Sequence, residues 1–218
     1  MSCDALFRAT EDKESAEHSQ CSLWQIYGYE ETPSLQLRAA EKLAAWAEKV
    51  AHFIVYHWLL VANVAMFLFL VPPFLAPLLS AAGAEFPARA IYTIYRLTCH
   101  QMPERSFFIF GKQVAFCARC SAIYLSFWGV GFVYGLWGIL LREKLAWPPL
   151  SLRWILVLLL PMALDGTMQF LGLRESTNLL RAITGTLAGS GFGLFIYPTL
   201  ETGFREAKKS LPSGFLSI

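Results

Sequence analysis

The sequence predicts an all-α membrane protein: a polytopic transmembrane helix bundle with about four spanning helices plus an interfacial helix. Hydrophobic residues make up 56% of the 218 residues and charged residues only 16%, whereas soluble domains carry about 25%. Charge is absent from residues 50–84, 121–141 and 182–200, and Asp165 is the one charged residue in 154–173. Because about 20 apolar residues cross a bilayer as a helix, the predicted spans are 53–79, 121–141, 153–173 and 180–200.

The spans form a predicted transmembrane domain, residues 51–200. The first 49 residues hold nine of the sixteen acidic residues, and residues 1–33 are expected to form a polar, disordered tail. Residues 34–50 are predicted as an amphipathic helix, capped by Ser34, on the membrane surface. Residues 201–218 form a short C-terminal tail, and no secretory signal peptide is recognised.

Lys and Arg are distributed unevenly between the predicted loops. Eleven lie in the tails and second loop, and seven lie on the other side. Basic residues gather on the cytoplasmic side, so we expect a multi-pass protein of the cell membrane with both termini cytoplasmic. With four spans, the first and third loops share one face in either orientation. No basic block indicates a nucleic-acid partner; the lipid bilayer is the expected partner.

The first loop gathers cysteines and a histidine. Cys117 and Cys120 form a C-x-x-C pair, and Cys99 with His100 lies before it. Four such ligands suit a zinc ion, and three would leave the open position of a catalytic site. Adjacent residues seldom bind one metal ion. In that case one of Cys99 and His100 would bind the metal, and the other would interact with a metal ligand without binding the ion itself. Thiol exchange promoted by Arg119, a disulfide, and inert packing all remain alternatives.

Polar residues also interrupt the third and fourth spans. Asp165 and Gln169 share a helical face, and a carboxylate within a bilayer indicates a functional site; we assign both a catalytic role, orienting water or substrate. The predicted anion-binding residues are Arg105, Arg119, Arg174, Asn178 and Arg181, because guanidinium groups match phosphate and carboxylate. The structural alternative is an ion pair between Asp165 and Arg181 that joins two helices.

Small residues and prolines predict how the helices pack. Glycines recur at every fourth position, at Gly185, Gly189 and Gly193 and at Gly131 and Gly135. Such stripes allow close backbone approach, and we interpret them as packing surfaces. Pro72, Pro73 and Pro77 are expected to kink or end the first span.

The motifs "CHQMPERSF" and "CARCSAIY", followed by the series Asp-Gly, Gln, Gly-x-Arg-x-Ser-x-Asn, Arg and Thr-Gly, resemble those of a family of small prokaryotic membrane proteins of unknown function. The resemblance covers about residues 90–195. Ser121-Ala122 stands where the family commonly has Thr-Gly. The resemblance implies one assembled site and names no activity.

Three functions follow from these patterns. The first is a membrane-embedded zinc site that binds or processes an anionic, phosphate-bearing lipid head group. The second is a non-catalytic accessory subunit of a membrane complex, stapled by a metal or disulfide. The third is a membrane thiol–disulfide oxidoreductase. The sequence leaves open whether the protein is an enzyme.

Overall fold

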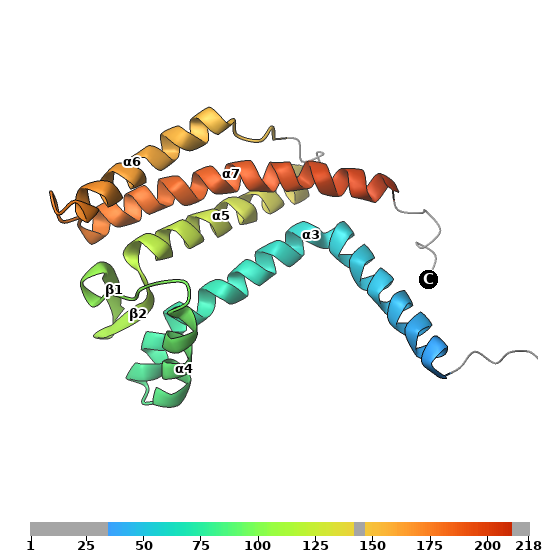
Figure 1. The fold of residues 1–218 in the computed structure, drawn as a ribbon, viewed down its shortest axis with the longest axis horizontal. Coiled ribbons are helices and arrows are strands. Elements are labelled where there is room, and N and C mark those ends of the chain that lie inside the picture. Colours follow the sequence, from blue (N-terminus) through green and yellow to red (C-terminus); the bar gives the residue numbers. More distant parts are fainter. Residues whose placement is uncertain (1–34, 142–146, 211–218) are drawn as a thin grey trace, which may run out of the picture. The chain divides into compact units, whose positions relative to one another are not determined.

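A computed structural model describes residues 35–141 and 147–210 (Figure 1). Its elements, in chain order, are α3 (Leu35–Ala81), α4 (Glu85–Tyr95), the 3₁₀ turn η1 (Pro103–Arg105), β1 (Ser106–Ile109), β2 (Lys112–Cys117), α5 (Ala118–Leu141), α6 (Leu152–Phe170) and α7 (Asn178–Ser210). In this part of the chain four helices, α3, α5, α6 and α7, are long and apolar enough to cross a membrane. The predicted helical fold with four spans is therefore confirmed.

Helix α3 continues through its prolines. Pro72, Pro73 and Pro77 lie inside the helix, which ends only at Ala81, and the non-helical backbone is at His57. Of the two effects expected at these prolines, a kink or an end, the end does not occur; membrane helices tolerate proline because neighbouring groups satisfy the freed carbonyls. Residues 35–50 are helical and form the first part of α3, and their place on the membrane surface stays a prediction. The tail 1–33 and the cap Ser34 lie outside the described residues.

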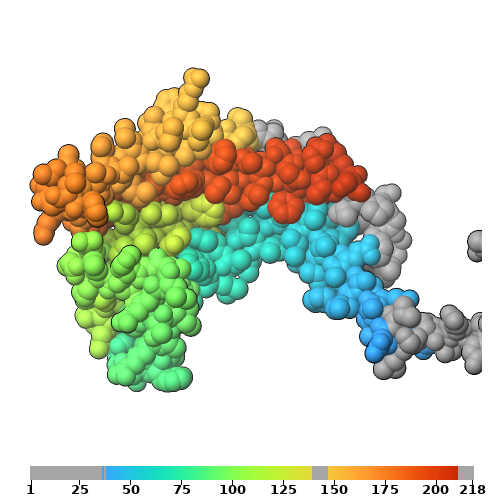
Figure 2. All heavy atoms as spheres, viewed as in Figure 1, coloured from blue at the N-terminus to red at the C-terminus, as the bar shows by residue number. Residues whose placement is uncertain are grey.

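Helix α7 packs against both α5 and α6 (Figures 1 and 2). The glycines of its stripe face α5: a Cβ at Gly189 would overlap the carbonyl oxygen of Ile123, and one at Gly185 would lie 2.8 Å from the carbonyl oxygen of Arg119. The stripe acts as the sequence predicts, since only glycine permits this backbone approach. Helix α7 also extends to Ser210, beyond the predicted span that ends at residue 200.

The first loop contains an antiparallel hairpin that the sequence analysis did not predict. Strands β1 and β2 pair with Ile109 opposite Lys112. The two residues between them, Phe110 and Gly111, have φ of 51° and 73°. Two positive φ values define the type I′ turn that matches the twist of two-residue hairpins.

An aromatic cluster fixes the hairpin to α3, α4 and α5. Phe116 of β2 is fully buried and its ring contacts those of Phe69, Tyr95 and Tyr124. The Tyr95 hydroxyl donates a 2.7 Å hydrogen bond to the Phe69 carbonyl. This cluster holds the end of β2 and the loop after α4 close together, and both carry cysteines.

Candidate metal centre and polar network

Three cysteines from two segments meet where α5 begins. The Sγ atoms of Cys99, Cys117 and Cys120 all lie within 4.8 Å of one another, and none is in a disulfide. Cys99 follows α4, Cys117 ends β2, and Cys120 lies in the first turn of α5. Three thiols so close together are suited to a metal ion. The C-x-x-C motif supplies two of them, and Cys99 supplies the third.

Backbone N–H groups surround the sulfur of Cys99. Cys117 N donates to Cys99 Sγ at 3.1 Å, and the Gln101 amide also hydrogen-bonds this sulfur. Gln101 reaches it with φ of 52°, in the left-handed region. Hydrogen bonds from the Cys117 and Cys120 side chains lower the pKa of the Cys99 thiol, against the opposing effect of burial. These bonds favour the thiolate, which is the form that binds metal.

His100 does not join the three sulfurs. Its side chain is exposed, and in the described residues the ligand group comprises the cysteines alone. Cys99 points into the cluster of buried residues, whereas the adjacent His100 faces outward. Cys3 and Cys21 lie outside the described residues.

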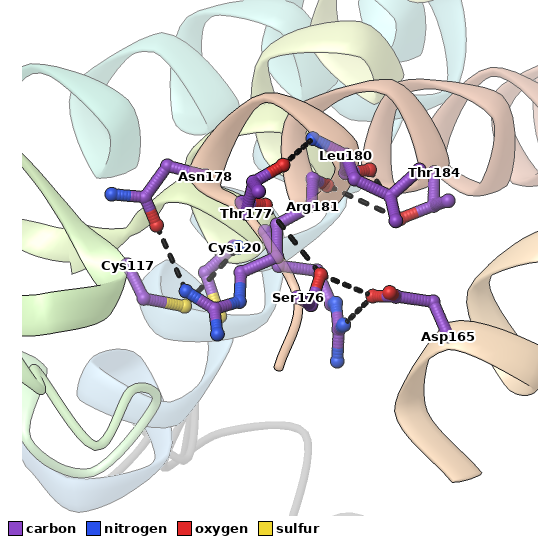
Figure 3. A network of polar contacts seen from close by, with 10 residues as sticks. Cys117, Cys120, Asp165, Ser176, Thr177, Asn178, Leu180, Arg181 and Thr184 are labelled. Atoms are coloured by element: carbon purple, nitrogen blue, oxygen red, sulfur yellow. Dashed lines mark hydrogen bonds and ion pairs between the residues drawn. The ribbon is translucent and has the colours of Figure 1, made fainter. Parts of the chain in front are cut away.

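Asp165 forms an ion pair with Arg119. The ion pair between Asp165 and Arg181 that the sequence offered as a structural alternative does not form. Arg119 Nη2 contacts Asp165 Oδ2, and the Ser176 hydroxyl donates to the same oxygen at 2.9 Å (Figure 3). The Asp165 side chain is 6% exposed, so both bonds are shielded from water. Arg119 precedes Cys120 directly, and this pair brings the predicted polar site of α6 to the cysteine cluster.

Arg181 is buried without a carboxylate partner among the described residues. It is 5% exposed, and its Nη1 donates to Asn178 Oδ1 at 2.9 Å. With its amide oxygen turned toward the guanidinium groups, Gln169 accepts from Arg181 at 2.8 Å and from Arg105 at 3.3 Å. The Nε of Arg181 has no partner. Two neutral amides thus hold a buried cation.

Electrostatic interactions connect Arg181 to the rest of the site. The groups that act on it include Arg105, Arg119, Asp165 and Cys117. Arg181 therefore interacts with two like charges, Arg105 and Arg119, and with one buried carboxylate, Asp165. Arg105 also lies 3.9 Å from Glu104, but both side chains are largely exposed, and exposed pairs contribute little. Arg174 lies in the turn before α7, exposed, and the structure describes no side-chain contact for it.

Hydrogen bonds attach the hairpin to α7 and to the cysteine loop. Asn178 Nδ2 donates to the Ser106 carbonyl at 3.3 Å. Gln113 Nε2 donates to the Gln101 carbonyl at 2.7 Å and to the Ser106 hydroxyl at 3.0 Å. The hairpin therefore connects the loop that carries Cys99 to the polar residues at the start of α7.

Sequence reasoning missed Ser176, Gln101 and Gln113. Ser176 and Gln101 stand inside the quoted motifs, but nothing in their residue type marks one as a carboxylate partner and the other as a left-handed backbone position. Gln113 belongs to the unpredicted hairpin, so its contact with Gln101 required the hairpin register.

Comparisons with known proteins agree on a family. Residues 99–195 match the family described as predicted membrane protein (DUF2085), a range that contains every site residue discussed above. The uncharacterized protein MJ1492 of Methanocaldococcus jannaschii is 41% identical over 145 residues, which cover 64% of this chain and 90% of the relative. An uncharacterized protein of Methanothermobacter thermautotrophicus is 38% identical over 100 residues, covering 46% and 85%. No solved structure matches the chain. The chain belongs to the DUF2085 family of predicted membrane proteins.

Proposed function

We propose that Cys99, Cys117 and Cys120 bind a zinc ion next to an anion-binding site at one membrane face. The observation that carries this proposal is the mutual approach of three sulfur atoms within 4.8 Å. Zinc bound by three protein ligands keeps a position for water or substrate. When bound, the ion would supply Lewis-acid character at that position.

The anion-binding part consists of Arg181 and Arg105, held by Gln169 and Asn178. A buried charge without a counter-charge is costly, and the two amides that contact Arg181 are neutral. One zinc ion with three thiolates carries a net charge of −1. The three guanidinium groups of Arg105, Arg119 and Arg181, together with the carboxylate of Asp165, carry a net charge of +2. One positive charge remains for a ligand. The N-termini of α5 and α7 also lie here, and helix N-termini favour anions.

The proposed ligand is the phosphate of an anionic lipid head group or another phosphate-bearing molecule. Gln169 lies in the last turn of α6 and Arg181 in the first turn of α7, two segments long enough to span the membrane, so the site would lie at the head-group level of one membrane face. In this proposal Asp165 acts by orienting Arg119 with Ser176, and Gln169 positions the two guanidinium groups against the ligand. Arg119 contributes positive charge, and Arg174 stands at the exposed edge.

We also propose an orientation. The Lys and Arg distribution supports both termini in the cytoplasm, with the metal centre at the opposite face and residues 34–50 on the cytoplasmic membrane surface. A cysteine introduced at Ser210 should then react with a membrane-impermeant maleimide only after the cells are opened, in a chain whose own cysteines are replaced.

Metal analysis of the purified protein in detergent tests the centre. We expect about one zinc per chain and protection of three thiols from alkylation. Cys117→Ser should abolish the bound metal, whereas Cys21→Ser, a change outside the described residues, should retain it. Full-length protein without metal, with all its thiols reactive, would overturn the zinc assignment.

Thiol–disulfide exchange is the second candidate, favoured by the stabilised thiolate of Cys99 beside the C-x-x-C pair. It predicts a mixed disulfide that accumulates in Cys120→Ser when the protein is exposed to oxidised substrate, and redox cycling of the wild type without metal. A metal that remains bound and a lack of any response to phosphate would instead favour the accessory subunit of a membrane complex.

A further inference from the structure

A second site lies at the other end of α7. The structure contains a cavity of about 1060 Å³, formed by α3, α5 and the C-terminal turns of α7. None of the cysteines or polar residues of the metal centre lines it. From Asn178, where α7 meets the metal centre, thirty residues of helix lead to Lys208, a rise of about 45 Å. The cavity and the metal centre therefore face opposite membrane surfaces.

The wall of this cavity is divided into an apolar part and a polar part. Leu60 of α3 and Phe132 and Leu136 of α5 form the apolar part, and each is more than 40% exposed. The polar part comes from the last turns of α7, including Glu201 and Lys208. A ligand that satisfies both parts must be amphipathic, and the size exceeds the 300–1,000 Å³ that holds drug-sized molecules.

The acidic side chains of the cavity are already paired. Glu201 accepts from the Trp58 indole at 2.8 Å through one carboxylate oxygen and from Arg205 at 2.7 Å through the other. Glu206 pairs with Lys209 at 2.7 Å. Neither carboxylate is therefore free to neutralise a further cation.

Lys208 is the cation that lacks a carboxylate partner among the described residues. Its ammonium group lies 5.5 Å from the centre of the Tyr56 ring, and such a contact holds a cation at a rim without neutralising it. Tyr56 and Trp58 mark the depth, because Tyr and Trp gather at the head-group level of membranes. The Lys208 ammonium group therefore lies at head-group depth, next to the apolar part of the cavity wall.

We propose that this cavity binds one anionic membrane phospholipid, with its acyl chain along Leu60, Phe132 and Leu136 and its phosphate at Lys208. The non-helical backbone of α3 at His57 lies in the wall of the cavity, since His57 and Leu60 both line it. The lipid acts as a structural ligand between α3 and α7, two helices that also meet here through the Trp58–Glu201 hydrogen bond, the stacked rings of Trp58 and Phe204 and the Lys208–Tyr56 contact. This site is independent of the zinc proposal.

Native mass spectrometry of the full chain in detergent, with added phosphatidylglycerol or phosphatidylcholine, tests the proposal. We expect one phosphatidylglycerol to remain bound, and Lys208→Gln to weaken its binding about fivefold, the effect of one cation near an anionic phosphate. Lys209→Gln, which removes a cation already paired with Glu206, should change the affinity less than twofold.

A second variant tests the apolar wall without touching the charge. Thr202 lines the cavity and is exposed, so Thr202→Trp should fill the space and abolish the bound lipid while α7 stays folded. Equal binding of both lipids, equal effects of the two lysine substitutions, or an unaltered bound lipid in Thr202→Trp would each overturn the proposal.

Discussion

Arg119 and Asp165 form an ion pair that joins the first turn of α5 to the last turns of α6. Arg119 lies between the two cysteines of the C-x-x-C motif, so this pair connects the cysteine-bearing segment to the buried carboxylate. An ionised side chain in the bilayer costs several kcal/mol when it is alone. The pair with Arg119 and the hydroxyl of Ser176 explain how Asp165 remains in an apolar helix.

Removal of one partner should therefore destabilise the protein. We expect Asp165→Asn to lower the free energy of unfolding by about 3 kcal/mol, since it leaves Arg119 without its partner. Arg119→Gln should have a similar effect, and the double variant should cost less than the two single costs combined. Thermal unfolding in detergent measures the stability of the wild type, the two single variants and the double variant. If the losses of stability in the single variants add up to that of the double variant, the ion pair contributes nothing to stability.

The two guanidinium groups at Gln169 give a sharper test of the anion site. Gln169→Glu would supply the counter-charge that Arg181 lacks, so it should raise the melting temperature in phosphate-free buffer and remove any further rise on adding inorganic phosphate. Wild-type protein should be stabilised by phosphate more than by chloride. Arg89→Gln, which removes an exposed cation of α4, serves as the control and should respond as the wild type does.

Close packing of α5 and α7 predicts a strong effect at Gly189. Gly189→Ala places a Cβ against the Ile123 carbonyl, and overpacking of this kind costs about 1–3 kcal/mol. Gly129→Ala is the matched control in α5, because nothing lies within 4 Å of its new Cβ. Size-exclusion yield and melting temperature should fall for the first variant alone; equal behaviour of both would place the helices further apart.

The turn of the hairpin can be tested through its backbone. Gly111 has φ of 73° and open space around it, so a substitution there tests strain without a clash. We expect Gly111→Val to lower stability by about 1–2 kcal/mol and Gly111→Asn to cost much less, because asparagine tolerates the left-handed region. Zinc retention at low chelator concentration should follow the same order, since β2 carries Cys117.

The number and position of the spans could be predicted because the bilayer imposes a length and an absence of charge that a single sequence displays. The glycine stripes likewise predicted close helix packing, although not that α5 and α7 are the helices in contact. The arrangement of the cysteines could be predicted only in part. Spacing brought Cys99 and His100 together with the C-x-x-C pair but did not choose between them, because that Cys99 joins the pair and His100 faces away depends on the course of the loop after α4.

The partner of Asp165 was beyond the reach of helix periodicity. Arg119 and Arg181 both lie on the correct membrane face, and the choice between them depends on how α6 rotates against α5 and α7. The non-helical backbone of α3 at His57 could not be predicted either, because histidine has no backbone property that ends a helix. The three prolines do disfavour a helix, yet α3 continues through them.

Gly189 has a consequence for the whole length of the bundle. Its backbone lies against that of Ile123, so α5 and α7 are in close contact at this point and resist sliding past each other. The metal centre is attached to one end of this pair of helices and the lipid cavity to the other. We expect the two helices to tilt as one rigid lever, so that a ligand bound at either membrane surface alters the geometry at the opposite one.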